Sequence, residues 1–342
     1  MGKLKIFDST LRDGSHAIGH KFTKKNIEDY CKAVDNSGLH TIIVGHGNGL
    51  GASSLQVGLS LLQDNDMLSI AKENLRKTKL GTFLIPGFGT INDNIKPAIK
   101  CGVDLFCIAS HCTEADVTRQ HIEYVRHNDK EVYGVLMMYH MASTERILIE
   151  AKKMQSYGAR GIIVMDSAGA STPELVKKTI ATLYDGLDIP VGIHPHNNLG
   201  LAVANAYIAI KEGAEIVDGT LRGFGAGAGN CQLEALIALL IKNNIKTKVD
   251  FYKVLDASEE IVRTMMENDK GLSAISIVSG MSGVFSAFTK HVQVAAKEFN
   301  VDARDIFIEL GKLKVVGGQE DMILTVASEL AKQKLQNQLM SF

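Results

Sequence analysis

Eight short runs of β-branched and other apolar residues recur along the first two thirds of the chain, and this recurrence most constrains the fold. Most of the runs are followed by a polar or glycine-containing turn and then by a stretch with apolar residues at helical spacing. This alternation is typical of repeated βα units around a parallel sheet, and eight such units close a barrel. The runs are Lys5–Ser9, Thr41–Gly45, Lys79–Ile85, Leu105–Ser110, Val132–Met138, Gly161–Asp166, Val191–His194 and Glu215–Asp218.

The helical stretches between these runs often end at a glycine, as helix C-termini do. Gly38, Gly102, Gly158 and Gly213 each stand just before the next strand. An open doubly wound sheet is the alternative, but Ser9–Gly14 has no glycine-rich phosphate fingerprint. We therefore predict an α/β fold of the TIM (β/α)8 barrel type. The expected helices include Lys24–Ser37, Asn92–Cys101, Ala115–His127, Ser143–Tyr157, Thr172–Tyr184 and Leu201–Glu212.

The eighth unit ends near Asn244, which matches the roughly 250 residues typical of such a barrel. We predict a catalytic barrel over residues 1–250 and a small helical C-terminal domain over residues 251–342. Because no proline-rich linker separates them, the two domains are expected to pack together. In the second domain we expect helices at Phe251–Asn268, Ala287–Phe299, Ala303–Leu313 and Glu320–Lys332, and a glycine-punctuated stretch at Gly271–Gly283.

Composition excludes several classes of partner. The 342 residues carry 37 basic and 38 acidic side chains, a net charge of −1, and no Trp. Nucleic-acid binding, which calls for a basic stripe with stacking aromatics, is therefore not expected. The five cysteines are odd in number and include no C-x-x-C pair, which favours a reducing cytoplasm over a disulfide framework. No run of about 18 apolar residues indicates a membrane span, so we expect a cytoplasmic enzyme.

Polar residues gather just after the predicted strands, where TIM barrels carry their active sites. They are Arg12, Asp13 and His16 after the first strand, His46 and Asn48 after the second, His111 and Glu114 after the fourth, Asp166 and Ser167 after the sixth, His194, His196, Asn197 and Asn198 after the seventh, and Arg222 with the loop Gly223–Asn230 after the eighth.

The sharpest local signal is His194-Pro195-His196, because residues two apart on a strand point the same way. Pro195 cannot donate to a sheet, so the strand ends here, at the rim of the barrel. With Asp13 as a third ligand, the two imidazoles would form a mixed nitrogen and oxygen site for Mn²⁺, Mg²⁺, Zn²⁺ or Fe²⁺. The alternative is a polar strand end whose hydrogen bonds are satisfied within the protein.

Arg12 and His16 supply the groups that an acid–base reaction needs beside such a metal. The Arg12 cation is suited to a substrate carboxylate or a developing oxyanion, and His16 to the role of base. The alternative for Arg12 is an ion pair with Asp13. The loop Gly225–Asn230 can offer backbone N–H groups to an anion, although close packing explains its glycines equally well.

The chain resembles the 4-hydroxy-2-oxovalerate aldolases of aromatic meta-cleavage pathways, which belong to the metal-dependent barrels related to HMG-CoA lyase. The likeness reaches into the tail, which resembles that family's C-terminal communication domain. The motifs that carry it are Phe7–Ala17, Pro86-Gly87, His111–Asp116, Asp166–Ala170, His194–Asn198, Gly225–Asn230, Glu309–Gly311 and Val316–Ile323.

This resemblance implies a carbon–carbon lyase that splits a 4-hydroxy-2-oxo acid into pyruvate and an aldehyde. Asp13, His194 and His196 would hold a divalent ion, most often Mn²⁺, with Mg²⁺ or Co²⁺ as alternatives. Arg12 would stabilise the enolate and His16 would be the base. The expected substrate contacts are Arg12, Asp13, Ser167, His194 and Phe285.

Phe285 marks a departure from the family, which places a substrate-facing tyrosine there. The last tyrosine of the chain is Tyr252, so no neighbour replaces it. Loss of that hydroxyl puts stereochemical control in question and leaves room for a larger aldehyde as an alternative substrate. Tyr139 stands where the family usually has serine, and we hypothesise that it supplies a compensating hydroxyl at the barrel mouth; an aromatic packed at the rim is the alternative.

The resemblance also implies an acylating aldehyde dehydrogenase as a partner, and the segment Glu320–Lys332 could equally serve a homodimer. Two other functions stay open. One is a Claisen condensation of acetyl-CoA with a 2-oxo acid, as in isopropylmalate and homocitrate synthases. The other is a non-catalytic partner subunit that kept the barrel.

Overall fold

The computed structural model describes residues 4–266 and 272–340 and shows a closed barrel of eight parallel strands. Each strand pairs with the next along the chain, and β8 pairs with β1. The predicted barrel is confirmed, with every strand within two residues of its expected bounds. The strands are β1 (Lys5–Asp8), β2 (Thr41–Ile43), β3 (Lys79–Leu84), β4 (Leu105–His111), β5 (Glu131–Met137), β6 (Ile162–Asp166), β7 (Val191–Pro195) and β8 (Ile216–Gly219).

Two layers of apolar side chains hold the barrel. The inner layer fills its interior and includes Phe7, Phe83, Tyr133 and Ile163, all of them buried. The outer layer packs the other face of the strands against the surrounding helices. Because both faces are buried, the strands read as continuous apolar runs instead of alternating patterns.

The helices of the barrel follow the strands as expected. Thr23, Ser143 and Thr172 each cap the first turn of a helix with a side-chain oxygen, so these starts were readable in the sequence. The helix α3 was not indicated by the patterns, and no side chain caps its first turn. The helices are α1 (Gly14–Ala17), α2 (Lys24–Val34), α3 (Asp64–Asn74), α4 (Lys96–Lys100), α5 (Arg119–His127), α6 (Thr144–Ser156), α7 (Pro173–Gly186), α8 (Ala202–Lys211) and α9 (Leu233–Lys242).

Further α-helices follow residue 250 in the described part of the chain. The first two add Val254 and Met265 to the outer layer of the barrel, whereas a later one buries Phe307 and Leu310 in a separate core. The two cores therefore separate after Met266, and the predicted division at residue 250 stays a prediction for the domains as units. The helices are α10 (Phe251–Asp256), α11 (Arg263–Met265), α12 (Ala274–Ser282), α13 (Thr289–Phe299), α14 (Ala303–Lys312) and α15 (Asp321–Met340).

The glycine-punctuated stretch Gly271–Gly283 contains α12; its first residue lies outside the described part of the chain. Ser273 caps the helix and Gly283 ends it at φ 68°. Gly280 lies inside the helix because a Cβ there would come within 2.8 Å of the Asn198 Cβ. The glycine therefore permits close packing and does not break the helix.

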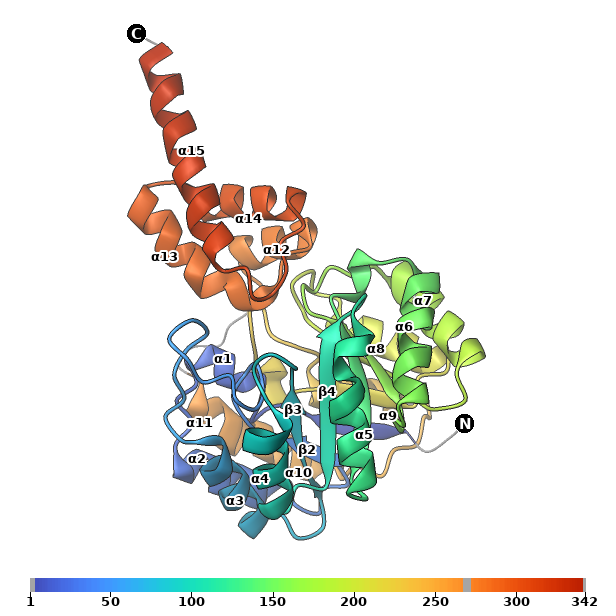
Figure 1. The fold of residues 1–342 in the computed structure, drawn as a ribbon. Helices are drawn as coiled ribbons and strands as arrows, with labels where there is room; N and C mark the ends of the chain where they lie inside the picture. Colours follow the sequence, from blue (N-terminus) through green and yellow to red (C-terminus); the bar gives the residue numbers. More distant parts are fainter. Residues whose placement is uncertain (1–3, 267–271, 341–342) are drawn as a thin grey trace.

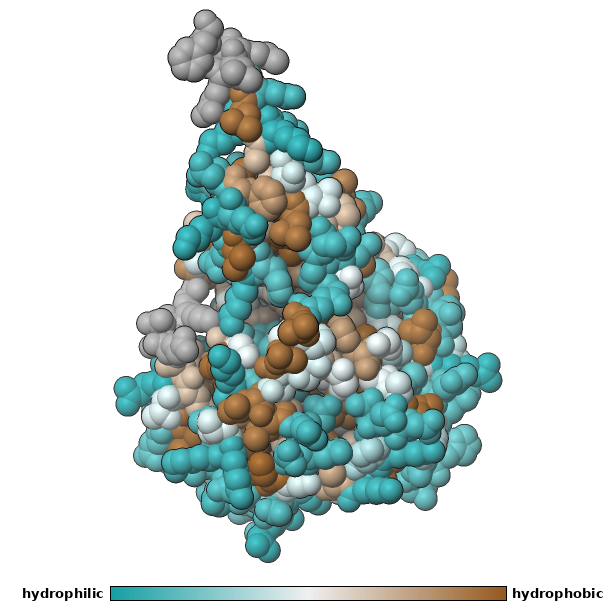
Figure 2. Space-filling view, turned by 60° about the vertical axis from the view of Figure 1, so that its left-hand side comes forward, coloured by the Kyte–Doolittle hydropathy of each residue, from teal (hydrophilic) through white to brown (hydrophobic). Residues whose placement is uncertain are grey.

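The C-terminal helices α12 to α15 pack over the end of the barrel toward which the strands point, and α15 projects away from the body (Figure 1). The molecule tapers from the broad barrel to this projecting helix (Figure 2). Asn198, after β7, joins the two parts: its Nδ2 donates to the Ser276 carbonyl at 3.2 Å, and its Oδ1 accepts from Ser286 Oγ at 3.0 Å. The Ser286 N–H donates to the Ser167 carbonyl at 3.1 Å. No helix in the described ranges is long and apolar enough to cross a bilayer.

Replacing Asn198 by Ala should loosen this seam. The change removes the bond to the Ser276 carbonyl and leaves the buried Ser286 hydroxyl without its acceptor, which costs about 1–3 kcal/mol. We expect a lower free energy of unfolding in urea for Asn198→Ala than for Asn243→Ala, whose exposed amide bonds only to the Leu239 carbonyl of its own helix. Equal losses in the two variants would show that the seam adds no stability.

Candidate active site

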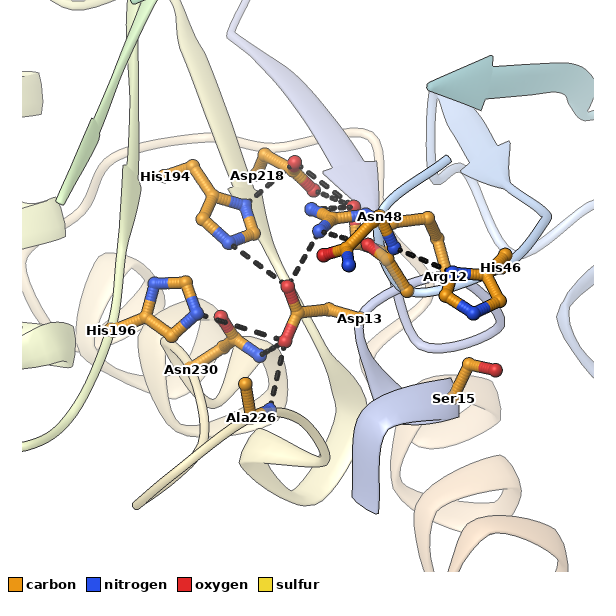
Figure 3. Close-up of polar contacts among 12 residues, drawn as sticks. Arg12, Asp13, Ser15, His46, Asn48, His194, His196, Asp218, Ala226 and Asn230 are labelled. Atoms are coloured by element: carbon orange, nitrogen blue, oxygen red, sulfur yellow. Dashed lines mark hydrogen bonds and ion pairs between the residues drawn. The ribbon is translucent and has the colours of Figure 1, made fainter. Parts of the chain in front are cut away.

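Asp13, His194 and His196 converge at the carboxyl end of the barrel (Figure 3). Asp13 lies in the turn after β1, His194 in β7 and His196 just beyond it. One ligand atom from each lies within 4.8 Å of the others, and all three side chains are buried. The Asp13 carboxylate is 3.8 Å from His194 Nε2 and 3.7 Å from His196 Nε2. The three predicted metal ligands are therefore brought together.

Hydrogen bonds behind the two imidazoles set which nitrogen faces Asp13. His194 Nδ1 contacts the Asp218 carboxylate at 2.7 Å, and His196 Nδ1 contacts the Asp166 carbonyl at 3.0 Å. Both partners accept, so each Nδ1 carries the proton and each Nε2 presents a lone pair to Asp13. His194 Nε2 is buried without a hydrogen-bond partner. Two nitrogen lone pairs and a carboxylate directed at one point form a donor set that fits a divalent cation.

Asp13 is fixed on its other sides. Its Oδ1 accepts from the Ala226 N–H at 3.0 Å and from Asn230 Nδ2 at 2.9 Å. Burial by itself would raise the pKa of this carboxyl, but the neighbouring Arg12 guanidinium holds that pKa well below its usual range. A Cβ at Gly225 would come within 2.5 Å of Asp13 Oδ1, so this glycine lets the loop approach the carboxylate.

Arg12 forms the ion pair with Asp13 that was the alternative interpretation of this sequence, at 2.6 Å through one terminal nitrogen. Its guanidinium also lies 4.7 Å from the centre of the Phe83 ring. The Nε of Arg12 is nevertheless buried without a hydrogen-bond partner. Arg12 thus keeps an unused donor beside the metal ligands, which suits a substrate carboxylate or enolate oxygen.

His16 lies half-buried on the wall of a cavity, at the end of α1. Burial lowers the pKa of His16 to about 4, although the Asp13 carboxylate opposes this shift. The imidazole is therefore neutral near pH 7 and able to accept a proton.

The cavity has a volume of about 940 Å³ and is lined by both parts of the chain. His16 and Gly225–Gly227 come from the barrel end, and Phe285 and Phe288 from the C-terminal helices. Phe285 meets Phe288 edge to face, with ring centres 5.8 Å apart. Phe285, which stands where the family places a tyrosine, thus adds an apolar ring to the wall of the cavity.

Other predicted residues lie apart from this wall. Ser167 is fully buried, and its Oγ accepts from the Met138 N–H at 3.2 Å, so its contact with substrate stays a prediction. Tyr139 is 1% exposed and packs in the outer layer of the barrel, so the hypothesis of a compensating hydroxyl at the mouth is wrong. It faces outward because Met138 has a left-handed φ of 54°, which turns the chain at the end of β5. Cys112 and Cys231 are buried, and burial raises the pKa of both thiols.

Sequence patterns missed two residues of this region, Asp218 beside His194 and His20 beside His16. Asp218 ends a predicted strand and was available as a signal, but nothing in the sequence showed that it faces His194 across neighbouring strands. His20 lies four residues after His16, and its ring centre is 5.1 Å from that of His16. A turn holds His20 in this place, and no local pattern in the sequence indicated that turn.

Comparison with known proteins identifies the family and the fold of the chain. Residues 3–261 match the HMGL-like family, and residues 271–332 match the DmpG-like communication domain. Among solved structures, the carboxyl transferase domain of Rhizobium etli pyruvate carboxylase shares the fold with a TM-score of 0.80, at 16% identity over 96% of this chain and 60% of that one. The chain is therefore a member of the HMGL-like barrels.

The chain is also similar over nearly its whole length to curated aldolases. It is 52% identical over 330 residues to a 4-hydroxy-2-oxovalerate aldolase of Pectobacterium atrosepticum, covering 96% of each chain. It is 48% identical to one of Spirochaeta aurantia, covering 95% of each. The chain belongs to the 4-hydroxy-2-oxovalerate aldolase family, as its motifs indicated.

The buried histidines predict a loss of stability in mild acid. Burial lowers the pKa of His20 to about 2 and that of His46 to about 4, below the ordinary value of 6.5. Below pH 6.5 the unfolded chain therefore binds more protons than the folded chain. The free energy of unfolding consequently decreases as the pH is lowered. Burial raises the pKa of Asp8 to about 6, which acts in the opposite direction. Burial also lowers the pKa of His16 and His40 to about 4, although solvent screens part of the effect at the half-buried His40. Together these shifts predict a net loss of several kcal/mol between pH 7 and pH 5.

Urea unfolding of metal-free protein at the two pH values measures this loss, because the pH dependence of metal binding is then absent. His46→Phe should show a smaller difference between pH 7 and pH 5 than the natural chain. Identical differences would mean that His46 is not held neutral in the folded state.

Proposed function

We propose that this chain is a divalent-metal-dependent pyruvate aldolase that splits a 4-hydroxy-2-oxo acid, of the 4-hydroxy-2-oxopentanoate type, into pyruvate and an aldehyde. The observation that carries the proposal is the meeting, in one region, of the Asp13, His194 and His196 donor set with the free donor of Arg12 and the neutral His16. The names of the relatives support the substrate class.

The chemistry follows from these groups. His16 removes the proton from the C4 hydroxyl of the substrate, the C3–C4 bond breaks, and the aldehyde leaves. The bonding electrons become the enolate of pyruvate, and Arg12 Nε donates to the oxygen that gains negative charge. Protonation at C3 then completes pyruvate. A divalent ion held by Asp13, His194 and His196 supplies a Lewis acid that stabilises this charge.

We propose Mn²⁺ as the ion, with Mg²⁺ and Co²⁺ as alternatives. A carboxylate with two imidazoles suits ions of intermediate hardness. Asp218 and the Asp166 carbonyl, which orient the two imidazoles, contribute to the affinity by fixing both rings before the ion arrives.

Pyruvate release from racemic 4-hydroxy-2-oxopentanoate tests the proposal. With Mn²⁺ present we expect steady release that chelation removes and that Mn²⁺ restores. Loss of a general base costs about 10²- to 10⁴-fold, so His16→Ala should lower kcat by that factor. His127→Ala, an exposed histidine at the end of α5, is the matched control and should equal the natural chain.

Failure has two distinguishable forms. Metal-dependent exchange of the pyruvate C3 protons for deuterium without cleavage would mean that the enolate forms but the aldehyde is a different one. If neither activity appears and thiol is released from acetyl-CoA with a 2-oxo acid, the enzyme is a condensing enzyme. A His16→Ala variant with full activity would remove His16 from the role of base.

We further propose that Phe285 relaxes the choice of substrate. Its apolar ring lines the cavity where a tyrosine would present a hydroxyl group. One hydrogen bond to a neutral group amounts to about 1 kcal/mol, or roughly fivefold in rate. Phe285→Tyr should therefore raise the ratio of kcat/KM between the two C4 enantiomers by about this factor, measured with the separated enantiomers. An unchanged ratio would mean that residue 285 does not face C4.

We propose an acylating aldehyde dehydrogenase as the partner, because residues 271–332 match a communication domain and the cavity is lined by residues of that domain. Exposed apolar side chains of the same region, among them Met281 and Val294, give it a surface for another protein. A homodimer through the same helices is the alternative arrangement. Sedimentation of the chain alone and with such a dehydrogenase separates the two.

A further inference from the structure

Two buried imidazoles beside the active site have no part in the chemistry described so far. The rings of His20 and His46 stack with centres 3.7 Å apart and planes inclined by 16°. His20 is 7% exposed and His46 is fully buried. Two positively charged imidazoles stacked at this distance would repel each other, so the two rings are not both protonated.

Hydrogen bonds select one tautomer for His46. Its Nδ1 accepts from the Asn48 N–H at 3.0 Å, and its Nε2 lies 3.0 Å from the Gly58 carbonyl. A carbonyl only accepts, so the proton is on Nε2. The ring thus ties the turn His46–Asn48 to the segment around Gly58.

His20 is held in a similar way. Its Nδ1 accepts from the Gly47 N–H at 3.4 Å and lies 3.2 Å from Ser15 Oγ, and the ring also bonds to the Val57 backbone. Both imidazoles therefore bind the same turn, His46–Asn48, through main-chain N–H groups.

The turn His46–Asn48 contacts both groups to which we assign the chemistry. The Gly47 carbonyl accepts from a terminal nitrogen of Arg12 at 3.3 Å. On its other side, Gly47 packs against His16 so closely that a Cβ there would lie 2.4 Å from His16 Nε2. A shift of this turn would therefore move Gly47, which packs against His16 and whose carbonyl accepts a hydrogen bond from Arg12.

The backbone of His20 supports a specific role. Its φ is 63°, in the left-handed region that costs a non-glycine residue about 1 kcal/mol or more. Glycine or asparagine would occupy this position with less strain, yet a buried imidazole stands here. Strain of this kind persists where the side chain has a task that offsets it.

We propose that His20 and His46 are positioning residues for the aldolase reaction: together they anchor the turn His46–Asn48 and so fix His16 and Arg12 relative to Asp13. The inference rests on the proposed function, in which His16 is the base. The hydrogen bonds to the two Nδ1 atoms, that of Ser15 Oγ included, are the essential contacts, and the stacking of the rings is secondary.

Phenylalanine and asparagine separate these two contributions. Phenylalanine keeps a flat ring in the stack but cannot accept a hydrogen bond. Asparagine loses the ring but carries an oxygen close to the position of Nδ1, and it tolerates a left-handed φ at position 20. The matched control is His40→Phe, because His40 also stacks on an aromatic ring, that of Phe7 at 5.3 Å, but near the start of β2 at the opposite end of the barrel.

A misplacement of about 1 Å can cost about 100-fold in rate, so we expect His20→Phe and His46→Phe to lower kcat by about 10- to 100-fold with KM within about threefold. His20→Asn and His46→Asn should keep kcat within about fivefold of the natural chain. Mn²⁺ affinity, followed by the electron paramagnetic resonance of the free ion, should stay the same in all four variants. His40→Phe should have the kcat of the natural chain.

The opposite order, with active phenylalanine variants and impaired asparagine variants, would show that packing alone matters and would overturn the proposal. An equal kcat in all variants would also overturn the proposal. So would a loss of kcat in His40→Phe as large as that in His20→Phe and His46→Phe. If the phenylalanine variants do not fold, Ser15→Ala takes their place, since it removes only the contact of Ser15 Oγ with His20. A kcat at least about threefold lower in this variant supports the proposal, and an unchanged kcat overturns it. His16→Ala is assayed in parallel: full activity there contradicts the proposed function itself, whereas an inactive His16→Ala beside unaffected His20 and His46 variants contradicts only this inference.

Discussion

The structure depends on one buried electrostatic arrangement, in which the lone pairs of His194 and His196 face the carboxylate of Asp13. Without a positive charge between them these groups repel, and at this depth water screens little of that repulsion. Asp218 and the Asp166 carbonyl accept from the two Nδ1 atoms and so direct both Nε2 atoms at Asp13. A divalent cation relieves the repulsion, and the strength with which the ion is held is set by groups that never touch it.

Each part of the fold serves to hold this arrangement at the end of the barrel. The neighbouring strands β7 and β8 place His194 beside Asp218, and the glycine loop after β8 brings Ala226 and Asn230 to the far side of Asp13. The C-terminal helices then cover the mouth, because Asn198, two residues after the ligand His196, bonds to both Ser276 and Ser286. The metal ligands and the cover are thus connected through a few covalent bonds of one loop.

The sequence was sufficient to predict the barrel and the meeting of Asp13, His194 and His196 for a physical reason. Strand periodicity is a local property of the sequence, so the ends of the strands can be read from it. Because TIM barrels carry their active sites at these ends, the periodicity also predicts where the site lies. The His194-Pro195-His196 motif is likewise readable within three residues. Features that depend on contacts between distant segments were not readable: Asp218 as partner of His194, Tyr139 turned into the outer layer, and α12, whose Gly280 packs on Asn198 instead of ending the helix.

The same distinction separates the reacting groups from those that place them. Arg12, Asp13 and His16 stand within five residues, so their chemistry could be inferred from one turn of chain. The relative position of Arg12 and His16 depends on Gly47, which belongs to another strand end. His20 bonds to the N–H of Gly47, and His46 bonds to that of the next residue, Asn48. A motif can therefore specify which groups react, whereas the distances on which the rate depends are set by main-chain contacts that the motif does not contain.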